Sequence, residues 1–523
     1  MQSSATPHNT DPRSDELPPL SIPVLTALVA AKIALHIPGL FHYGYFRDEL
    51  YFLDCARHLD WGYVDCAPLV AVYAKIALLL GGSLPALRIV PMIAGVGLIV
   101  MTVVLARQLG GGIFAQALAG MSILIAPVHL MIDSVLSMNS FEALFWMGCV
   151  WVVIRIIRTG DSRLWIVFGI LAGLGLENKH STLFFGAAVA VGVIATPLRR
   201  ELGKPWIWLG AAVALALFLP NLLWQWQHGF PTLEDLRNVR DIGKNVELAP
   251  GAFILQQVMM LNPATLPVWL AGLWFLLAGR GRRFRALGWT YLFLFGVLIA
   301  LHAKDYYLAP IYPMLFAAGG AAFEGWTKDL AGTRAKSTIR VAVLLSVMAA
   351  GAVIAPLALP ILEPDAYVAH QQRLGVAPQK AEVAHDGPLP QIWGDQFGWP
   401  ELVSEIAEIY NSLPPEERAR TGIYASNYGE AGAINLFGPA LGLPPAICAH
   451  QTHSMWGPGD FNGDTLIWLQ WEPEWLEGRC ASVEVVGEHH HPWGMEEENR
   501  PILLCRRLSA PLAEQWPDLT HWN

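Results

Sequence analysis

The feature of this sequence that most constrains its fold is a series of long apolar runs. The four clearest runs, which are nearly free of charged side chains, cover residues 84–106, 141–157, 205–224 and 341–362. About 20 consecutive apolar residues are enough to cross the hydrocarbon core of a bilayer as a helix. Only 15% of the 523 residues are charged, whereas soluble proteins have about 25%. The chain is therefore predicted to be a polytopic α-helical membrane protein, and its net charge of −9 gives no indication of nucleic-acid binding.

The apolar segments predict about eleven transmembrane helices. They lie near residues 20–40, 84–106, 112–130, 141–157, 164–177, 181–197, 206–224, 263–279, 286–302, 307–323 and 341–361. A further apolar segment, 68–81, has about 14 residues, a length that favours an interfacial or re-entrant helix over a span. The polar residues 1–19 lack the pattern of a cleaved signal peptide, so we expect the first apolar segment to remain as an anchor.

The basic residues predict the orientation of these helices. Alternate loops are rich in Lys and Arg, for example Arg155 and Arg158 in one and Arg282 and Arg283 in another, and such loops stay in the cytoplasm. The sequence then divides into a cytoplasmic tail (1–19), a transmembrane domain (20–361) with a first external loop (41–81), and an external domain (362–523). In a bacterium with two membranes this arrangement corresponds to the inner membrane, with the last domain in the periplasm.

The external domain is predicted to have an α/β fold. Short alternations of apolar and polar residues at 421–425, 465–470 and 481–486 are typical of strands, and 401–412 is typical of a helix. The segment contains Cys448, Cys480 and Cys505. One disulfide with three alternative pairings, or three buried free thiols, both fit this pattern.

Polar groups gather at the predicted outer face, where Arg47, Asp48 and Glu49 stand out in the first loop. An arginine beside two carboxylates fits a general base kept ionised by a neighbouring cation. An acidic pair at the start of a helix also fits an N-terminal cap that favours the helix dipole. The spacing alone leaves both interpretations open.

Two further outer junctions carry lysines. Lys179 and His180 lie between two predicted spans, and Lys304 precedes Asp305, Tyr306 and Tyr307 at another junction. Cations at the outer ends of helices run against the orientation rule and fit a phosphate site at headgroup level. The alternative is that the lysines merely extend toward lipid headgroups. His489, His490 and His491 match no metal-ligand spacing, so no metal is assigned, and a divalent cation has no support from ligand spacing.

Several motifs together resemble one family. The first apolar segment is followed by YFRDELYFLDCARHLDWGYVDCAPL, and later come LSMNSFEALFW, GLENKHSTLFF, LPNLLWQWQHGFPTLEDL and KDYYLAPIYPMLFAAGG. In the tail, SNYGEAGAINLFG and LPPAICAHQTHSMWGPG are similar to the external domain of bacterial members. The chain resembles the GT-C class of integral-membrane glycosyltransferases, in particular the family-39-like group related to protein O-mannosyltransferases and lipid A aminoarabinose transferases.

The resemblance implies a polyprenyl-phosphate-linked sugar donor, transfer on the external face and inversion at the anomeric carbon. Asp48 would be the base that deprotonates an acceptor hydroxyl, with Glu49 as its partner. The donor phosphate would be bound by Arg47, Lys179, His180 and Lys304. The substrate-binding set would comprise Tyr45, Asp65, Asp133, Asn139, Tyr306 and Tyr307.

Two departures from the family pattern concern phosphate and base chemistry. Relatives carry a lysine in the first loop where this chain has Cys66 and Ala67, so other cations must bind the phosphate. Relatives place an aspartate in the second external loop where this chain has Asn139, which cannot act as a base; Asp133 is a candidate substitute.

The sequence does not distinguish among four acceptors: lipid A, a cell-surface glycan, another lipid-linked glycan and a protein. We expect 225–262 and the tail to recognise it. A transporter or flippase is the alternative function. The sequence shows neither the internal repeat nor the pair of helices broken at mid-membrane that would favour it.

Overall fold

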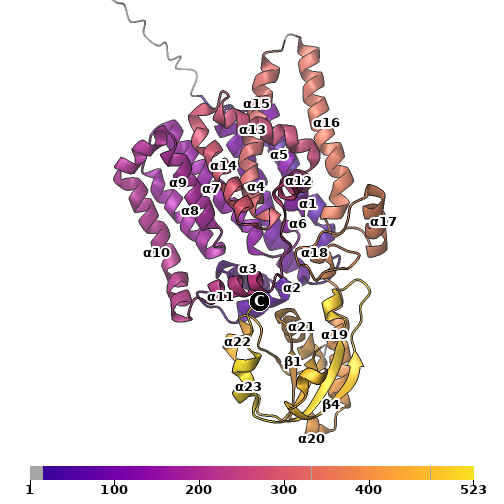
Figure 1. The fold of residues 1–523 in the computed structure, drawn as a ribbon. Helices are drawn as coiled ribbons and strands as arrows, with labels where there is room; N and C mark the ends of the chain where they lie inside the picture. Colours follow the sequence, from indigo (N-terminus) through magenta and orange to yellow (C-terminus); the bar gives the residue numbers. More distant parts are fainter. Residues whose placement is uncertain (1–15, 331, 471–472) are drawn as a thin grey trace, which may run out of the picture.

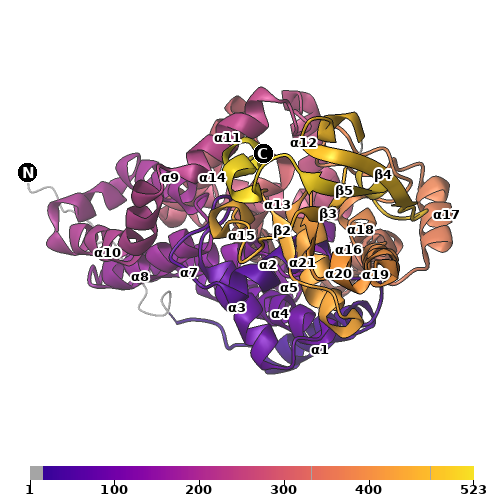
Figure 2. The same ribbon diagram turned by 90° about the horizontal axis from the view of Figure 1, so that it is seen from below.

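The computed structural model describes residues 16–330, 332–470 and 473–523. Most of the predicted cytoplasmic tail, residues 1–15, lies outside this described part. The remainder is a helical bundle joined to a smaller sheet domain (Figures 1 and 2).

The helices before residue 360 follow the apolar runs of the sequence. Each of the eleven predicted segments coincides with one helix of ten residues or more. These helices are α1 (Ile22–His36), α4 (Leu84–Gln108), α5 (Ile113–Leu124), α7 (Met138–Thr159), α8 (Leu164–Asn178), α9 (Thr182–Ile194), α10 (Pro205–Gln227), α13 (Leu266–Leu277), α14 (Arg285–Ala300), α15 (Tyr312–Lys328) and α16 (Thr333–Ala358). Among the described residues, six helices are long and apolar enough to cross a bilayer alone.

Two sharp bends explain part of the difference between eleven predicted spans and six. Thr182–Ile194 and Pro197–Gly203 meet at 105°, and Pro250–Met260 and Pro263–Leu277 meet at 93°. Counting each bent pair as one span raises the number to eight. Proline begins three of these four segments, where its missing N–H costs no helical hydrogen bond. These breaks were not predicted from the sequence.

The outer helices present apolar side chains to their surroundings. In α10 only 11% of the most apolar window is buried inside the protein, and in α16 only 17%. Exposed apolar surface of this extent is unfavourable in water and favourable in lipid. The molecule is a multi-span membrane protein.

Shorter helices occur between these spans and before the sheet domain. They are α2 (Arg47–Arg57), α3 (Leu69–Leu79), α6 (Pro127–Ile132), α11 (Pro231–Asp241), α12 (Pro250–Met260), α17 (Pro364–Leu374) and α18 (Gln391–Gly394). Figure 1 shows α2, α3 and α11 at the junction of the two parts. The segment predicted to be interfacial or re-entrant, 68–81, forms α3.

The C-terminal part contains one five-stranded sheet in the order β2-β1-β3-β5-β4. Its strands are β1 (Thr421–Ala425), β2 (Ala446–Cys448), β3 (Thr465–Leu469), β4 (Cys480–Glu488) and β5 (Pro501–Leu508). Strand β1 runs parallel to β2 and β3, whereas β5 is antiparallel to both of its neighbours. Its helices are α19 (Trp399–Ser412), α20 (Pro415–Arg418), α21 (Tyr428–Phe437), α22 (His453–Trp456) and α23 (Leu512–Leu519).

This architecture confirms the predicted α/β fold of the tail. The predicted strands correspond to β1, β3 and β4 and the predicted helix to α19, whereas β2 and β5 were not predicted. Of the three alternative cysteine pairings, the structure contains Cys480–Cys505, which joins β4 to β5, while Cys448 is a buried free thiol.

Candidate active site

Helix α2 places the two carboxylates of the first loop in different environments. Glu49 is fully buried and acts as a cap: its Oε2 accepts a hydrogen bond from the Phe46 N–H at 2.9 Å, and its Oε1 accepts one from the Leu136 N–H at 2.8 Å. The Arg88 guanidinium lies 3.7 Å away. A carboxylate at the third helical position satisfies an otherwise free backbone N–H. Of the two interpretations left open by the sequence, the N-terminal cap therefore applies to Glu49.

Asp48 is partly exposed and has a different partner. Its Oδ1 accepts a hydrogen bond of 2.9 Å from the hydroxyl of Tyr428, the first residue of α21. Burial raises the pKa of the Asp48 carboxyl above its ordinary value, and the charge of Arg47 and the Tyr428 hydrogen bond oppose this rise. A carboxylate of raised pKa is a stronger base than an ordinary aspartate, and it is held in place by a group of the C-terminal domain.

Arg47 is surrounded by carboxylates of the tail. Its Nη1 contacts Glu497, its Nη2 lies 3.3 Å from Glu382, and its Nε lies 3.5 Å from Asp395. The guanidinium also lies over the Tyr428 ring, 5.7 Å from the centroid. These contacts make Arg47 a link between the first loop and the C-terminal part, so its predicted role in phosphate binding requires one of the carboxylates to give way.

A second carboxylate, Asp65, lies near Asp48. The Tyr51 hydroxyl donates a 2.7 Å hydrogen bond to Asp65, and the Thr452 hydroxyl lies 2.5 Å from the same Tyr51 oxygen. Burial and the charges of Asp235 and Asp48 raise the pKa of Asp65 to about 7. The site therefore contains one carboxylate oriented by Tyr428 and another that titrates near neutral pH.

The predicted lysine sites come together with their tyrosines. Lys179 Nζ lies 2.8 Å from the Asn139 side-chain oxygen, which accepts its hydrogen bond, and 3.0 Å from a Glu142 oxygen. The same ammonium lies 4.4 Å from the centroid of the Tyr307 ring and 5.6 Å from that of Tyr306. Asn139 thus positions a cation here.

His180 and Lys304 differ in their contacts. His180 Nε2 lies 3.0 Å from Asn221 Oδ1 in α10, so it faces a neighbouring helix. The Lys304 ammonium makes no hydrogen bond, and no ion pair within 4 Å, to any residue that the structure describes, whereas its backbone carbonyl accepts from the Tyr307 N–H. Its charge nevertheless acts on Asp48, Asp235 and Glu382. Lys304 is therefore a cation near these carboxylates, and its N–H donors remain available.

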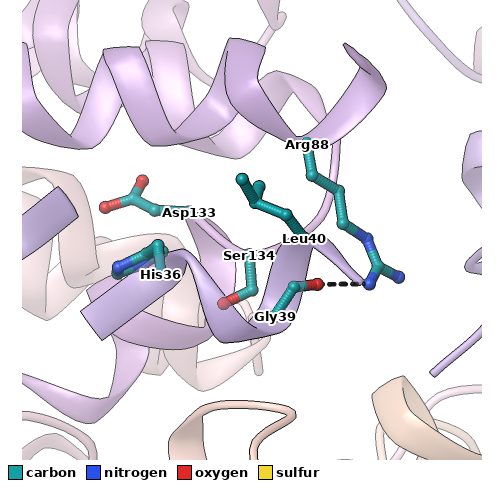
Figure 3. A pocket seen from close by; sticks show the side chains of 6 residues that line it. All are labelled: His36, Gly39, Leu40, Arg88, Asp133 and Ser134. Atoms are coloured by element: carbon teal, nitrogen blue, oxygen red, sulfur yellow. Dashed lines mark hydrogen bonds between the residues drawn. The ribbon is translucent and has the colours of Figure 1, made fainter. Parts of the chain in front are cut away.

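Two predicted substrate residues have contacts of their own. Asp133 is buried and pairs with Lys32 of α1 at 2.6 Å. Figure 3 shows it beside His36 and Ser134, in a small pocket that Arg88 also lines. The Tyr45 ring packs edge-on against Phe437 of α21, with centroids 5.8 Å apart. These contacts give Asp133 and Tyr45 structural partners, and the structure does not bring Asp133 into contact with Asp48 or Lys179.

The residues missed by the sequence analysis come chiefly from the tail. Tyr428 orients Asp48, Thr452 contacts Tyr51, and Glu382, Asp395 and Glu497 surround Arg47. Tyr428 lies in the SNYGEAG motif that carried the family resemblance, but no spacing linked it to a loop 380 residues away. In the described part of the chain no group of three His, Cys, Asp or Glu side chains forms a metal site.

Comparisons with known proteins concern the family and the fold. Residues 65–224 match the family model described as dolichyl-phosphate-mannose-protein mannosyltransferase. No curated protein sequence gives a significant match.

Two solved structures share the fold. One is ArnT from Cupriavidus metallidurans bound to undecaprenyl phosphate, with a TM-score of 0.58 and 15% identity over 92% of this chain and 97% of that one. The other is the oligosaccharyltransferase AglB from Archaeoglobus fulgidus in complex with an inhibitory peptide and a dolichol-phosphate, with a TM-score of 0.50 and 12% identity over 86% of this chain and 69% of that one. The fold is that of the GT-C class of integral-membrane glycosyltransferases, which confirms the predicted fold class.

Proposed function

We propose that this protein is an inverting glycosyltransferase that uses a polyprenyl-phosphate-linked sugar. The observation that carries the proposal is the environment of Asp48. This carboxylate is partly exposed, is oriented by the Tyr428 hydroxyl, has a raised pKa and lies near an uncompensated cation, Lys304. A base beside a cation, on this fold, suits deprotonation of an acceptor next to a phosphate leaving group.

The reaction is a single displacement. Asp48 Oδ2, which has no hydrogen-bond partner among the described residues, takes the proton of the acceptor hydroxyl. The acceptor oxygen bonds to the anomeric carbon from the side opposite the phosphate. The bond from that carbon to the phosphate oxygen breaks, and polyprenyl phosphate leaves with the electron pair, so the configuration inverts. The leaving group is already a stable anion, and a strong general acid is therefore unnecessary.

Lys304 and the Lys179 group supply the positive charge for the leaving phosphate. Lys179 is held by Asn139 and Glu142 and faces Tyr306 and Tyr307. The ArnT structure contains undecaprenyl phosphate, which supports a polyprenyl phosphate as the carrier here. The lysine missing at Cys66 is replaced in this proposal by Lys304.

The acceptor is proposed to be a glycan bound beside the site. A cavity of about 530 Å³ lies between α11 and the end of the chain, lined by Glu234, Asn238, Asp241, His521, Trp522 and Asn523. Carboxylates accept hydrogen bonds from hydroxyl groups, amides both accept and donate them, and an indole packs on the apolar face of a sugar ring. The volume is in the range of ligand pockets. This cavity joins the two regions, 225–262 and the tail, that were expected to recognise the acceptor.

The proposed location is the outer face of a bacterial inner membrane, with the N-terminus in the cytoplasm and the sheet domain in the periplasm. The Cys480–Cys505 disulfide supports an oxidising compartment for that domain.

The test is the Asp48→Asn variant, assayed for sugar transfer in membranes and for binding of undecaprenyl phosphate. Transfer is expected to fall by about 10²–10⁴-fold, because the amide cannot accept the proton. Binding of the carrier lipid is expected to persist. The matched control is Asp161→Asn, an exposed aspartate, which should transfer normally. Transfer by Asp48→Asn at the wild-type rate would remove the proposed base.

A further inference from the structure

Glu382 is a carboxylate of the tail that reaches into the cationic part of the site. It lies in the segment between α17 and α18, and its side chain is 14% exposed. One of its oxygens lies 3.3 Å from Arg47 Nη2 and 3.9 Å from Lys244 Nζ. Glu382 was not predicted as a site residue, and neither was Lys244.

The backbone around Glu382 is held against the loop that follows α11. Asn245 and Glu382 form an antiparallel bridge. The Val246 N–H donates to the Ala381 carbonyl at 3.1 Å, and the Val383 N–H donates to the Lys244 carbonyl at 2.9 Å. The side-chain oxygen of Gln391 accepts from the N–H groups of Ala381 and Glu382. We call residues 381–383 the strap.

Three cations act on the carboxylate of Glu382, and one of them, Arg47, also contacts Glu497 and Asp395. Lys304 is the third, since its charge acts on Glu382 as well as on Asp48. Burial alone would raise the pKa of Glu382, but the charges of Arg47, Lys244 and Lys304 lower it below the ordinary value. Lys244 Nζ also donates a 3.1 Å hydrogen bond to the main-chain oxygen of Asn523. Among the described residues, Glu382 is the one Asp or Glu side chain within 4 Å of Lys244, and the Lys304 ammonium has no such partner.

This arrangement resembles an anion-binding site that is occupied by a side-chain carboxylate. A phosphate and a carboxylate satisfy the same ammonium and guanidinium donors. A cation in a partly buried site is costly without a counter-charge or hydrogen-bond partners. The Glu382 carboxylate can hold neighbouring cations in place until another anion binds to them.

We propose that Glu382 is a stand-in for the donor phosphate, and that binding of the lipid-linked sugar exchanges this carboxylate for the phosphate on Arg47, Lys244 and Lys304. This inference rests on the proposed function. The exchange releases the strap from the site and couples donor binding to the loop after α11, and α11 itself lines the acceptor cavity. Donor affinity is then lower than the cations alone would produce, because the carboxylate competes.

The test measures binding of undecaprenyl phosphate to the full-length protein in lipid nanodiscs. Glu382→Gln keeps the shape of the side chain and removes the competing charge. It is expected to bind the lipid about five- to tenfold more tightly than the wild type. Glu363→Gln, which removes an exposed carboxylate, controls for net charge and should leave the affinity unchanged. Lys244→Met should weaken binding in the Glu382→Gln background.

The outcomes separate this inference from the proposed function. If the wild type does not bind undecaprenyl phosphate at all, the proposed donor class fails, and the exchange fails with it. If the wild type binds but Glu382→Gln binds equally or more weakly, the stand-in role is overturned while the function stands. Should Glu382→Gln not fold, Glu382→Asp withdraws the carboxylate by one methylene and keeps its charge. Tighter binding by Glu382→Asp supports the exchange, and equal or weaker binding overturns it.

Discussion

At the scale of single residues, the adjacent carboxylates Asp48 and Glu49 have different roles. Consecutive side chains on an α-helix point about 100° apart, so Asp48 and Glu49 of α2 cannot face the same space. Glu49 turns inward to cap the helix, and Asp48 turns toward Tyr428 and the partly exposed site. The two interpretations that the spacing left open are therefore divided between the two residues in the structure.

Asp65 leads to a prediction about pH. Its pKa in the folded protein is about 7, raised by burial from 3.8. The folded state therefore holds this proton more tightly than the unfolded state, and the resulting stability is complete below about pH 4 and is lost as the pH rises to about 7. Asp65→Asn cannot titrate. The unfolding temperature of the wild type relative to Asp65→Asn should fall across this range and then level off.

Thermal unfolding of both proteins at a series of pH values measures this difference. Asp161→Asn, at an exposed position, should differ from the wild type by the same amount at every pH. A constant difference for Asp65→Asn as well would mean that Asp65 titrates in its ordinary range.

At the scale of elements, the site depends on how closely α2 and α21 cross. Gly432 of α21 lies against the backbone of Leu50 in α2, and a Cβ there would be 2.7 Å from the Leu50 carbonyl oxygen. One turn earlier in α21, the Tyr428 hydroxyl reaches Asp48. A small residue at the crossing therefore lets a tail residue orient the base.

Gly432→Ala is expected to destabilise the protein by about 1–3 kcal/mol, because the backbone of α2 cannot yield to the added methyl group. It should also lower transfer, since the helices separate and Tyr428 moves away from Asp48. Gly186→Ala is the matched control: it lies in α9 with open space around its Cβ and should be neutral or slightly stabilising. Unfolding temperatures and transfer rates test both, and equal behaviour of the two variants would contradict the tight crossing.

At the scale of the whole molecule, the sheet domain completes the site. Residues from 382 to 453 contact the first loop through Glu382, Tyr428 and His453, the last of which lies 3.0 Å from Asp54. The helical bundle supplies the lysines and the sheet domain supplies the groups that orient Arg47 and Asp48. Neither part contains the complete arrangement.

The disulfide offers a test of where this domain lies. If the domain is outside the cytoplasm, Cys480 and Cys505 should be joined in cells and react with an alkylating reagent only after reduction. The four other cysteines are buried free thiols and should react only after unfolding, with or without reduction. Mass spectrometry of peptides alkylated before and after reduction distinguishes these states. Alkylation of Cys480 and Cys505 without reduction would contradict the periplasmic location.

The sequence by itself determined the features that depend on local pattern. Apolar runs predicted the helices because lipid requires about 20 apolar residues in a span, and alternation predicted β1, β3 and β4 because strand side chains alternate between two faces. The acidic loop and the lysines at Lys179 and Lys304 were found because charge is rare in such a chain. The bends near residues 195 and 262 were not, since the short apolar segments on both sides also fit separate straight spans.

Only the tertiary structure decided which of these groups meet. It joined Asn139 to Lys179, paired Asp133 with Lys32, chose Cys480–Cys505 among three pairings, and brought Tyr428 to Asp48 and Glu382 to Arg47. These contacts join positions from 25 to 380 residues apart, and no periodicity in the sequence encodes such a distance. They follow from the packing of whole helices and of the sheet domain, which sets their position only after the chain has folded.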